Sequence, residues 1–189
     1  MQGNEQLLGE LAKIDPRKPF GTALFDALAK VTVTPAVEAV CLRLQHYLPE
    51  IDAPRSLEVQ VYLIQRSPDD TAYHGEWHCP GSVLRPGEDI EDVFARLQKK
   101  EFNPSAVHFG RRQFVANVNH PTEARGHFLS LVYLCELVDD VAASWDTSSL
   151  RGKWFPVDNL PEKTVETHRV RIIPAALGAF VAENTKICD

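Results

Sequence analysis

Apolar residues recur along this chain at two spacings, and each spacing predicts a different kind of element. Alternating or continuous apolar and β-branched runs predict strands at residues 36–44, 57–66, 113–117 and 128–137. Apolar residues that recur every three or four positions predict helices at residues 6–14 and 22–30, and a third helix that begins at Asp89. Strands and helices mixed in this order favour an α/β (α+β) fold, with a mixed β-sheet sandwiched between helices (α/β/α).

The two N-terminal helices predict a division of the chain into an extension and a main domain. We assign residues 1–35 to an N-terminal helical extension and residues 36–189 to the main domain, since 189 residues suit one domain. Leu24, Phe25 and Leu28 share one side of the second helix. We expect the extension to pack on the main domain or on a second subunit, without chemistry of its own.

The segment before and within the third helix carries the most specific pattern. Residues 75–102 read GEWHCPGSVLRPGEDIEDVFARLQKKEF, which predicts a strand end, a glycine turn and a helix with Asp89 as N-cap. This segment resembles the Nudix box, G-x5-E-x7-R-E-U-x-E-E-x-G-U, in which U is a bulky aliphatic residue. With Ser82 at the first glycine, Glu88 and Arg96 match the first glutamate and the arginine. The resemblance implies that these two side chains form a structural ion pair between loop and helix.

The three later glutamates of the box fall on Leu97, Lys100 and Glu101, so two of the three are replaced. Nudix hydrolases cleave phosphoanhydride bonds of nucleoside diphosphates linked to another group, and they need divalent cations to do so. Positions 97, 100 and 101 share one helix face. Leu97 cannot ligate a metal, and Lys100 places a cation there. The resemblance therefore leaves Glu101 as the catalytic and metal-binding candidate, and we expect magnesium to bind weakly or not at all.

The resemblance extends beyond the box, over about residues 36–182. A strand that ends at Arg66 is followed by Gly75-Glu76-Trp77 and Pro80-Gly81, an order similar to that of the family. Residues 152–161 and 167–181 are similar to the turn and the last helix of the family. The resemblance implies the Nudix fold.

Seven polar residues in these segments are predicted to bind a ligand: Arg66, Glu76, Ser82, Lys100, Glu123, Arg125 and His168. Residues 117–127, NVNHPTEARGH, are predicted to form a polar loop that supplies His120, Glu123 and Arg125 to the site. A solvated turn without a function is the alternative, and both remain open. His168 lies at the start of the last predicted helix, where free N–H groups attract anions.

Charge and cysteine usage narrow the classes of partner. A net charge of −6 and a pI near 5.6 argue against a broad surface for nucleic acid or membrane, whereas a small phosphorylated ligand needs only a local positive patch. The four cysteines lack paired spacing, which favours free thiols. Without an apolar leader or a long apolar run, we expect a cytoplasmic protein. A homodimer is an open alternative, since dimers are common in the family.

Three functional hypotheses follow. The first is a Nudix-family protein that resembles pyrophosphohydrolases acting on linked nucleoside diphosphates, with catalysis impaired by Leu97 and Lys100. The second is a non-catalytic module that binds or senses a nucleotide or sugar phosphate. The third is a structural protein whose N-terminal helices bind a partner. The presence or absence of metal beside Glu101 would separate the first two.

Overall fold

The structure is a computed structural model that describes residues 2–19, 21–47, 56–102, 107–139 and 152–185. Its elements, in chain order, are α1 (Gln2–Leu11), α2 (Thr22–Ala29), β1 (Val33–Tyr47), β2 (Ser56–Gln65), β3 (Trp77–His78), β4 (Gly81–Val83), α3 (Ile90–Glu101), β5 (Val107–Glu123), β6 (Gly126–Asp139), β7 (Gly152–Pro156), the π-helical turn η2 (His168–Ile172) and α4 (Ile173–Thr185).

The strands of the described residues form one mixed sheet. Its order is β3-β2-β1-β6-β5, with β4 paired to β1 and β7 paired to β2. β1 runs parallel to β6 and antiparallel to β2 and β4, so this long strand lies at the centre of the sheet. The mixed sheet predicted from the sequence is confirmed.

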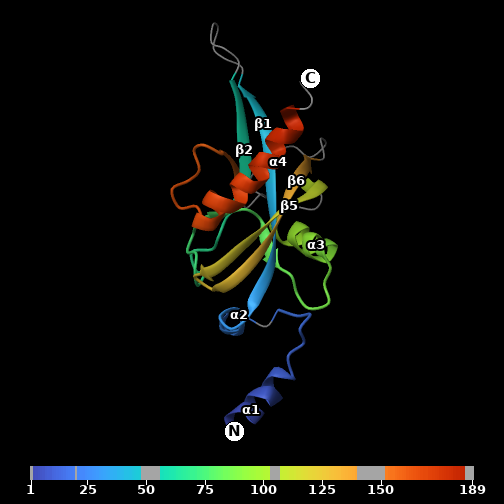
Figure 1. The fold of residues 1–189 in the computed structure, drawn as a ribbon, viewed down its shortest axis with the longest axis vertical. Helices are drawn as coiled ribbons and strands as arrows, with labels where there is room; N and C mark the ends of the chain where they lie inside the picture. The colour runs from blue at the N-terminus through green and yellow to red at the C-terminus, as the bar shows by residue number, and fades with distance from the viewer. Residues whose placement is uncertain (1, 20, 48–55, 103–106, 140–151, 186–189) are drawn as a thin grey trace.

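Helices cover both faces of the sheet, and the strands alternate accordingly (Figure 1). In β1, Val37 and Ala39 face the cluster that contains the buried residues of α3. Val40 and Leu42 point the opposite way, into the cluster that contains Ile173 of α4. Because successive side chains of a strand alternate between faces, both faces of the strand are apolar and both are covered. The α/β/α sandwich predicted from the sequence is confirmed.

The predicted loop at residues 117–127 is wrong, because these residues belong to two paired strands. β5 continues to Glu123 and β6 begins at Gly126, so the two strands form a hairpin. Pro121 is tolerated because β5 is an edge strand and its register is interrupted between His120 and Glu123. The first strand is also longer than predicted, since β1 begins at Val33 and not at residue 36.

Helix α2 packs against the sheet near the turn of this hairpin. The ring of Phe25 lies 6.4 Å from that of Phe128, centroid to centroid. Gly126 has a positive φ of 144°, and a Cβ at this position would lie 2.0 Å from the carbonyl oxygen of Ala29. The absence of a side chain at Gly126 therefore allows the end of α2 to approach the hairpin closely.

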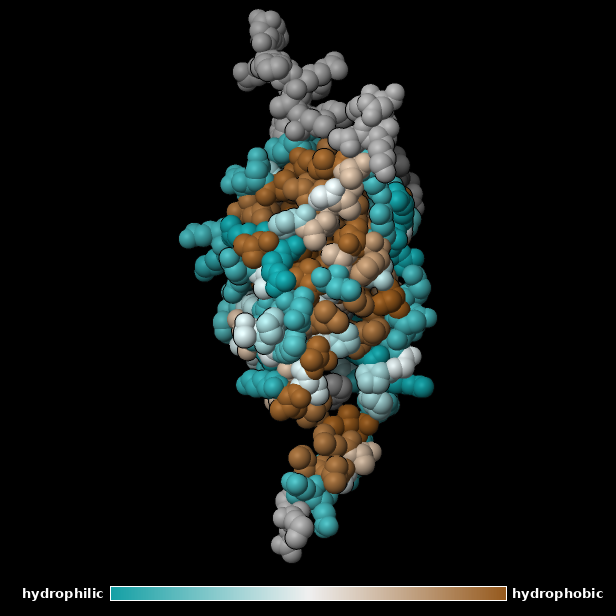
Figure 2. Space-filling view, in the orientation of Figure 1, coloured by the Kyte–Doolittle hydropathy of each residue, from teal (hydrophilic) through white to brown (hydrophobic). Residues whose placement is uncertain are grey.

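Helix α1 projects from the body of the protein and exposes Leu7 and Leu8 (Figures 1 and 2). The division at residue 35 stays a prediction. Among the described residues, no helix is both long enough and apolar enough to cross a membrane. Cys41, Cys79 and Cys135 are buried free thiols, whereas Cys188 lies outside the described residues.

Candidate functional site

The N-terminus of α3 is defined by a capping box. The side chain of Asp89 accepts a hydrogen bond from the Asp92 N–H at 2.9 Å, and the side chain of Asp92 accepts one from the Asp89 N–H at 3.0 Å. These bonds satisfy N–H groups that would otherwise have no partner in the first turn. The helix start predicted at Asp89 is confirmed, and it fixes the position of residues 81–88, which comprise β4 and the turn that follows it and are named here the box loop.

Arg96 connects α3 to the box loop. Its Nε and Nη2 donate to the two carboxylate oxygens of Glu88 at 3.0 and 2.6 Å, and its Nη2 also donates to the Val83 carbonyl at 2.9 Å. A further contact joins Arg96 to the Ser82 hydroxyl. Arg96 lowers the pKa of Glu88 by hydrogen bonding, although partial burial acts in the opposite direction. The ion pair expected from the sequence is present.

The helix face that corresponds to the box glutamates lacks a carboxylate cluster. Leu97 is 1% exposed and packs in the core beside Tyr62. Glu101 is 6% exposed, and its Oε1 lies 2.7 Å from the ammonium group of Lys100. Among the described residues, no group of three His, Cys, Asp or Glu side chains is placed to hold a metal ion. One carboxylate neutralised by a lysine does not fit the oxygen-rich coordination that magnesium requires.

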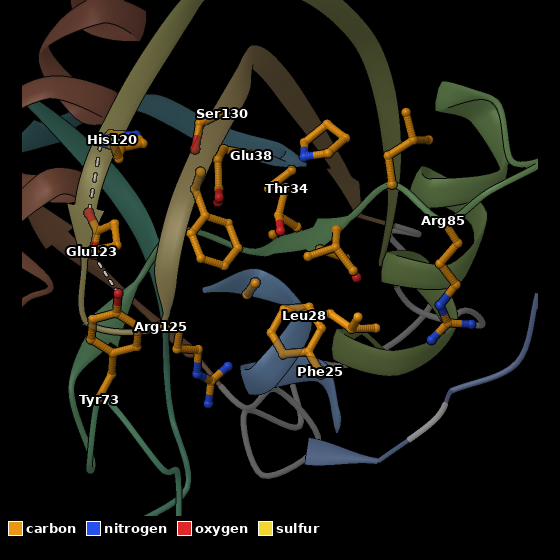
Figure 3. Close-up of a pocket in the computed structure, with 18 of the residues that line it drawn as sticks. Phe25, Leu28, Thr34, Glu38, Tyr73, Arg85, His120, Glu123, Arg125 and Ser130 are labelled. Atoms are coloured by element: carbon orange, nitrogen blue, oxygen red, sulfur yellow. Dashed lines mark hydrogen bonds and ion pairs between the residues drawn. The ribbon is translucent and has the colours of Figure 1, made fainter. Parts of the chain in front are cut away.

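A cavity of about 680 Å³ lies where α2, the start of β1, the box loop, the β5–β6 hairpin and η2 meet (Figure 3). Six of the predicted ligand residues line this cavity: Arg66, Ser82, Lys100, Glu123, Arg125 and His168. The structure thus brings together residues from five segments that lie far apart in the sequence.

Glu76 and Glu101, which we also expected in the pocket, are not among the lining residues. A backbone hydrogen bond holds Glu76 in position: its carbonyl accepts from the Arg66 N–H at 3.0 Å, at the end of the β2–β3 pair. Glu101 follows Lys100 in the last turn of α3, and its side chain is buried. The roles proposed for both residues stay predictions.

Glu38 is a site residue that the sequence interpretation missed. It lies in the middle of β1, is 8% exposed and lines the cavity. Its β4 partner is Gly81, where a Cβ would lie 2.1 Å from Glu38 Oε2, so the glycine leaves room for the carboxyl group. Burial raises the pKa of Glu38 to about 8, although the positive charge of Arg66 and the hydroxyl of Ser130 act against this rise. An acidic residue inside the apolar run AVEAVCLRL was the available signal.

The hairpin end of the cavity holds a connected set of polar groups. Tyr73 donates a hydrogen bond of 2.5 Å to Glu123 Oε2, and His120 Nδ1 lies 3.8 Å from Glu123 Oε1 (Figure 3). Burial raises the pKa of Tyr73, and the hydrogen bond to Glu123 raises it further. Two cationic side chains lie next to this set: the carboxylate of Asp70 lies 2.8 Å from Arg125 and 3.3 Å from Arg66.

Charged side chains of both signs line the cavity. Four cationic and three acidic side chains line it: Arg66, Arg85, Lys100 and Arg125, and Glu38, Asp70 and Glu123. Because the pKa of Glu38 is about 8, this acid is mostly neutral at pH 7. Burial lowers the pKa of His168 to about 3 and also lowers that of His120, so neither histidine is charged at pH 7. Two of the four cations are also paired with acids that do not line the cavity, Lys100 with Glu101 and Arg125 with Asp26.

One wall of the cavity is apolar. Phe25 and Leu28 of α2 form it (Figure 3), and Phe128 at the start of β6 also lines the cavity. We had predicted that these two α2 residues share a helix face, but not that this face borders a cavity. Their position depends on the contact of α2 with the hairpin, for which no local sequence signal exists.

Comparisons with known proteins agree with the fold. A mutT/nudix family protein from Listeria innocua superimposes with a TM-score of 0.59 at 18% identity, over 80% of this chain and 96% of that one. NrtR from Shewanella oneidensis superimposes with a TM-score of 0.53 at 18% identity, over 79% of this chain and 64% of that one. The NUDIX domain of NrtR, crystallised with ADP ribose, gives a TM-score of 0.52 at 18% identity, over 92% and 97%. At these identities the likeness establishes the fold.

No curated protein sequence matches the chain. The model of the NUDIX domain family matches residues 52–176, which is more than half of the chain and contains the box loop, α3 and the hairpin. This match, together with the fold, shows that the chain belongs to the Nudix family.

Proposed function

We propose that this Nudix protein binds a small phosphorylated ligand in its cavity and hydrolyses it slowly or not at all. The observation that carries the proposal is the α3 face, where Leu97 is buried in the core and Lys100 neutralises Glu101. Metal-dependent cleavage of a phosphoanhydride needs a cluster of oxygen ligands at that face. With those ligands replaced, binding is the activity that the remaining residues support.

The charge of the cavity supports a phosphorylated ligand. Four cationic side chains line it, and among them Lys100 lies on the α3 side. Lys100 takes the place of a metal-bound carboxylate, so its ammonium group is suited to contact a phosphate directly. The NUDIX domain of Shewanella oneidensis NrtR was crystallised with ADP ribose, which makes this compound the first ligand to test.

Residual metal-dependent hydrolysis is the second candidate function, favoured by the retained carboxylate of Glu101. Glu88 and Glu123 are the acids that could serve as additional ligands. Glu88 is held by Arg96, and Glu123 accepts the hydrogen bond of Tyr73, so each carboxylate is already engaged. Recruiting either one to a metal would break a bond of the site, which supports the first candidate over the second.

Nucleic acid is not part of the proposal. NrtR from Shewanella oneidensis was crystallised with a 27mer DNA, but this chain spans only 62% of that one. The net charge of −6 opposes a broad surface for a polyanion. The absence of nucleic-acid binding therefore stays a prediction. The cytoplasmic location and the homodimer stay predictions as well.

The test measures ADP-ribose binding by calorimetry, first with EDTA and then with magnesium, alongside product formation. We expect binding that does not need metal, and turnover far below the 1–10³ s⁻¹ typical of enzymes. Lys100→Glu should weaken metal-free binding about ten-fold, through loss of a charge-assisted bond. Lys99→Glu is the matched control, because Lys99 makes the same charge change one position away, is exposed and does not line the cavity.

Ordinary magnesium-dependent turnover by the wild type, lost in Glu101→Gln, would overturn the proposal and leave a diverged hydrolase. The double variant Leu97→Glu with Lys100→Glu tests whether restored carboxylates bring back metal binding. It should gain magnesium affinity, measured by calorimetry, because it restores the carboxylates of the face. Lys100→Glu alone serves if the buried charge at position 97 prevents folding.

A further inference from the structure

Buried polar atoms without partners lie at one end of the cavity. His120 is 4% exposed and lines the cavity, and among the described residues neither of its ring nitrogens has a hydrogen-bond partner. The Nε of Arg66, another lining residue, is buried without a partner as well. Buried polar groups are nearly always satisfied, because losing water without a replacement costs free energy. Atoms of a ligand in the cavity would supply the missing partners.

The groups around His120 can both donate and accept hydrogen bonds, and all of them except Glu123 are neutral at pH 7. Glu38, Tyr73, His120, Glu123 and Ser130 form this part of the lining, which we call the polar end (Figure 3). Burial lowers the pKa of His120, so its ring presents one N–H donor and one nitrogen acceptor at pH 7. Burial raises the pKa of Glu38 to about 8, so its carboxyl group presents an O–H donor and a carbonyl acceptor.

A phosphate is poorly suited to the polar end. The carboxylate of Glu123 lies within it, 3.8 Å from His120, and would repel an anion held by the His120 ring. Arg66 and Arg125 lie beside this end, but each is paired with Asp70, at 3.3 and 2.8 Å, whereas Figure 3 shows Arg85 on the far side of the cavity from His120 and Glu123. Between these two regions lie Phe25 and Leu28, which give the cavity an apolar wall. The cavity therefore has two chemically different ends.

We propose that the polar end, through His120 and Glu38, recognises a neutral hydroxyl-bearing sugar group of the ligand, while the phosphate lies toward Arg85 and Lys100. Sugar hydroxyls both donate and accept, which matches the mixed donors and acceptors of the polar end. The carboxylate of Glu123 can accept from such hydroxyls without charge repulsion. The inference rests on the proposed function, because it assigns a place to the part of the ligand that is not phosphate.

The test compares two probes that share an ADP moiety and differ in a terminal ribose. ADP-ribose and ADP are titrated against the wild type and variants in EDTA. His120→Ala should weaken ADP-ribose about ten-fold, since one or two hydrogen bonds are lost, and change ADP less than about two-fold. His108→Ala is the matched control, because His108 is an exposed histidine of the same strand, outside the cavity. It should change neither affinity.

Glu38 offers a pair of variants with opposite expectations. Glu38→Ala removes the donor and the acceptor and should lower ADP-ribose affinity selectively, as His120→Ala does. Glu38→Gln keeps a neutral donor and acceptor of the same shape and should retain most of the preference. If His120→Ala and Glu38→Ala weaken the affinities for ADP-ribose and ADP equally, the inference is overturned, because the polar end would then bind the ADP moiety. Unchanged affinities for both probes would also overturn the inference.

A titration of the wild type with D-ribose separates this inference from the proposed function. The ring signals of His120, followed by NMR and assigned with His120→Ala or by other spectra if that variant does not fold, should shift on addition of the sugar. If neither ADP-ribose nor ADP binds but D-ribose shifts the NMR signals of His120, the proposed function is refuted and the sugar recognition by the polar end is supported. If the sugar leaves His120 unchanged as well, the inference falls with it.

Discussion

Replacing Glu38 by glutamine tests the energetic cost of the buried acid in β1. The carboxyl group is 8% exposed, and burial raises its pKa from 4.5 to about 8. Glutamine keeps the shape of the side chain and removes the proton that titrates. The variant therefore separates the ionisation of Glu38 from its packing.

The sign and size of the effect follow from linkage. Because the folded state binds the Glu38 proton more tightly than the unfolded state, rising pH destabilises the fold between pH 4.5 and about 8. The slope approaches 1.4 kcal/mol per pH unit within this window, so wild type should lose about 3–4 kcal/mol from this group between pH 5 and 8. Glu38→Gln should lack this loss and should gain stability relative to wild type as pH rises.

Urea unfolding followed by tryptophan fluorescence at five pH values from 5 to 9 measures the effect. The buried histidines, whose lowered pKa values destabilise the fold as pH falls below 6.5, are present in both proteins and cancel in the difference. Glu166→Gln at an exposed site is the control and should follow wild type. Parallel stability curves for wild type and Glu38→Gln across the whole range would refute the argument.

Substitutions at three further positions test how the cavity is held in place. Arg96→Ala should lower the free energy of unfolding by about 2 kcal/mol in urea titrations, since the half-buried Glu88 and its loop lose their partner; an unchanged midpoint would contradict this. Gly126→Ala should cost about 3 kcal/mol in the same assay, because a Cβ meets the Ala29 carbonyl at a positive φ; wild-type stability would refute the close contact. Asp89→Ala should cost about 1 kcal/mol and Asp89→Ser much less, as expected for an N-cap; equal losses would exclude capping.

Local patterns predicted the framework of the fold well, because its determinants are local. The capping residue Asp89 and the apolar stripe with Val93 and Leu97 lie within one segment, so periodicity alone defines α3. The segment at 117–127 was misassigned for the opposite reason. Its proline, glycine and polar residues are typical of a loop, but an edge strand with an irregular register accepts all of them.

The cavity was predicted only in part, because its remaining residues meet through tertiary contacts. Arg66 and His168 could be named from the segments that resemble the family. Glu38 could not, since an acid in an apolar strand becomes informative only when the opposite position, Gly81, is known to leave room for it. Nor does the sequence indicate that Tyr73 reaches Glu123 across 50 positions of the chain.

The apolar wall supplied by α2 has a consequence for how ligand selectivity can change. The family match begins at residue 52, whereas Phe25 and Leu28 precede it, so part of the cavity lies outside the matched segment. Exchange of one eight-residue helix, Thr22–Ala29, could reshape the cavity without touching the box loop or α3. Part of the cavity lining can thus be redesigned while the box loop and α3 are left intact.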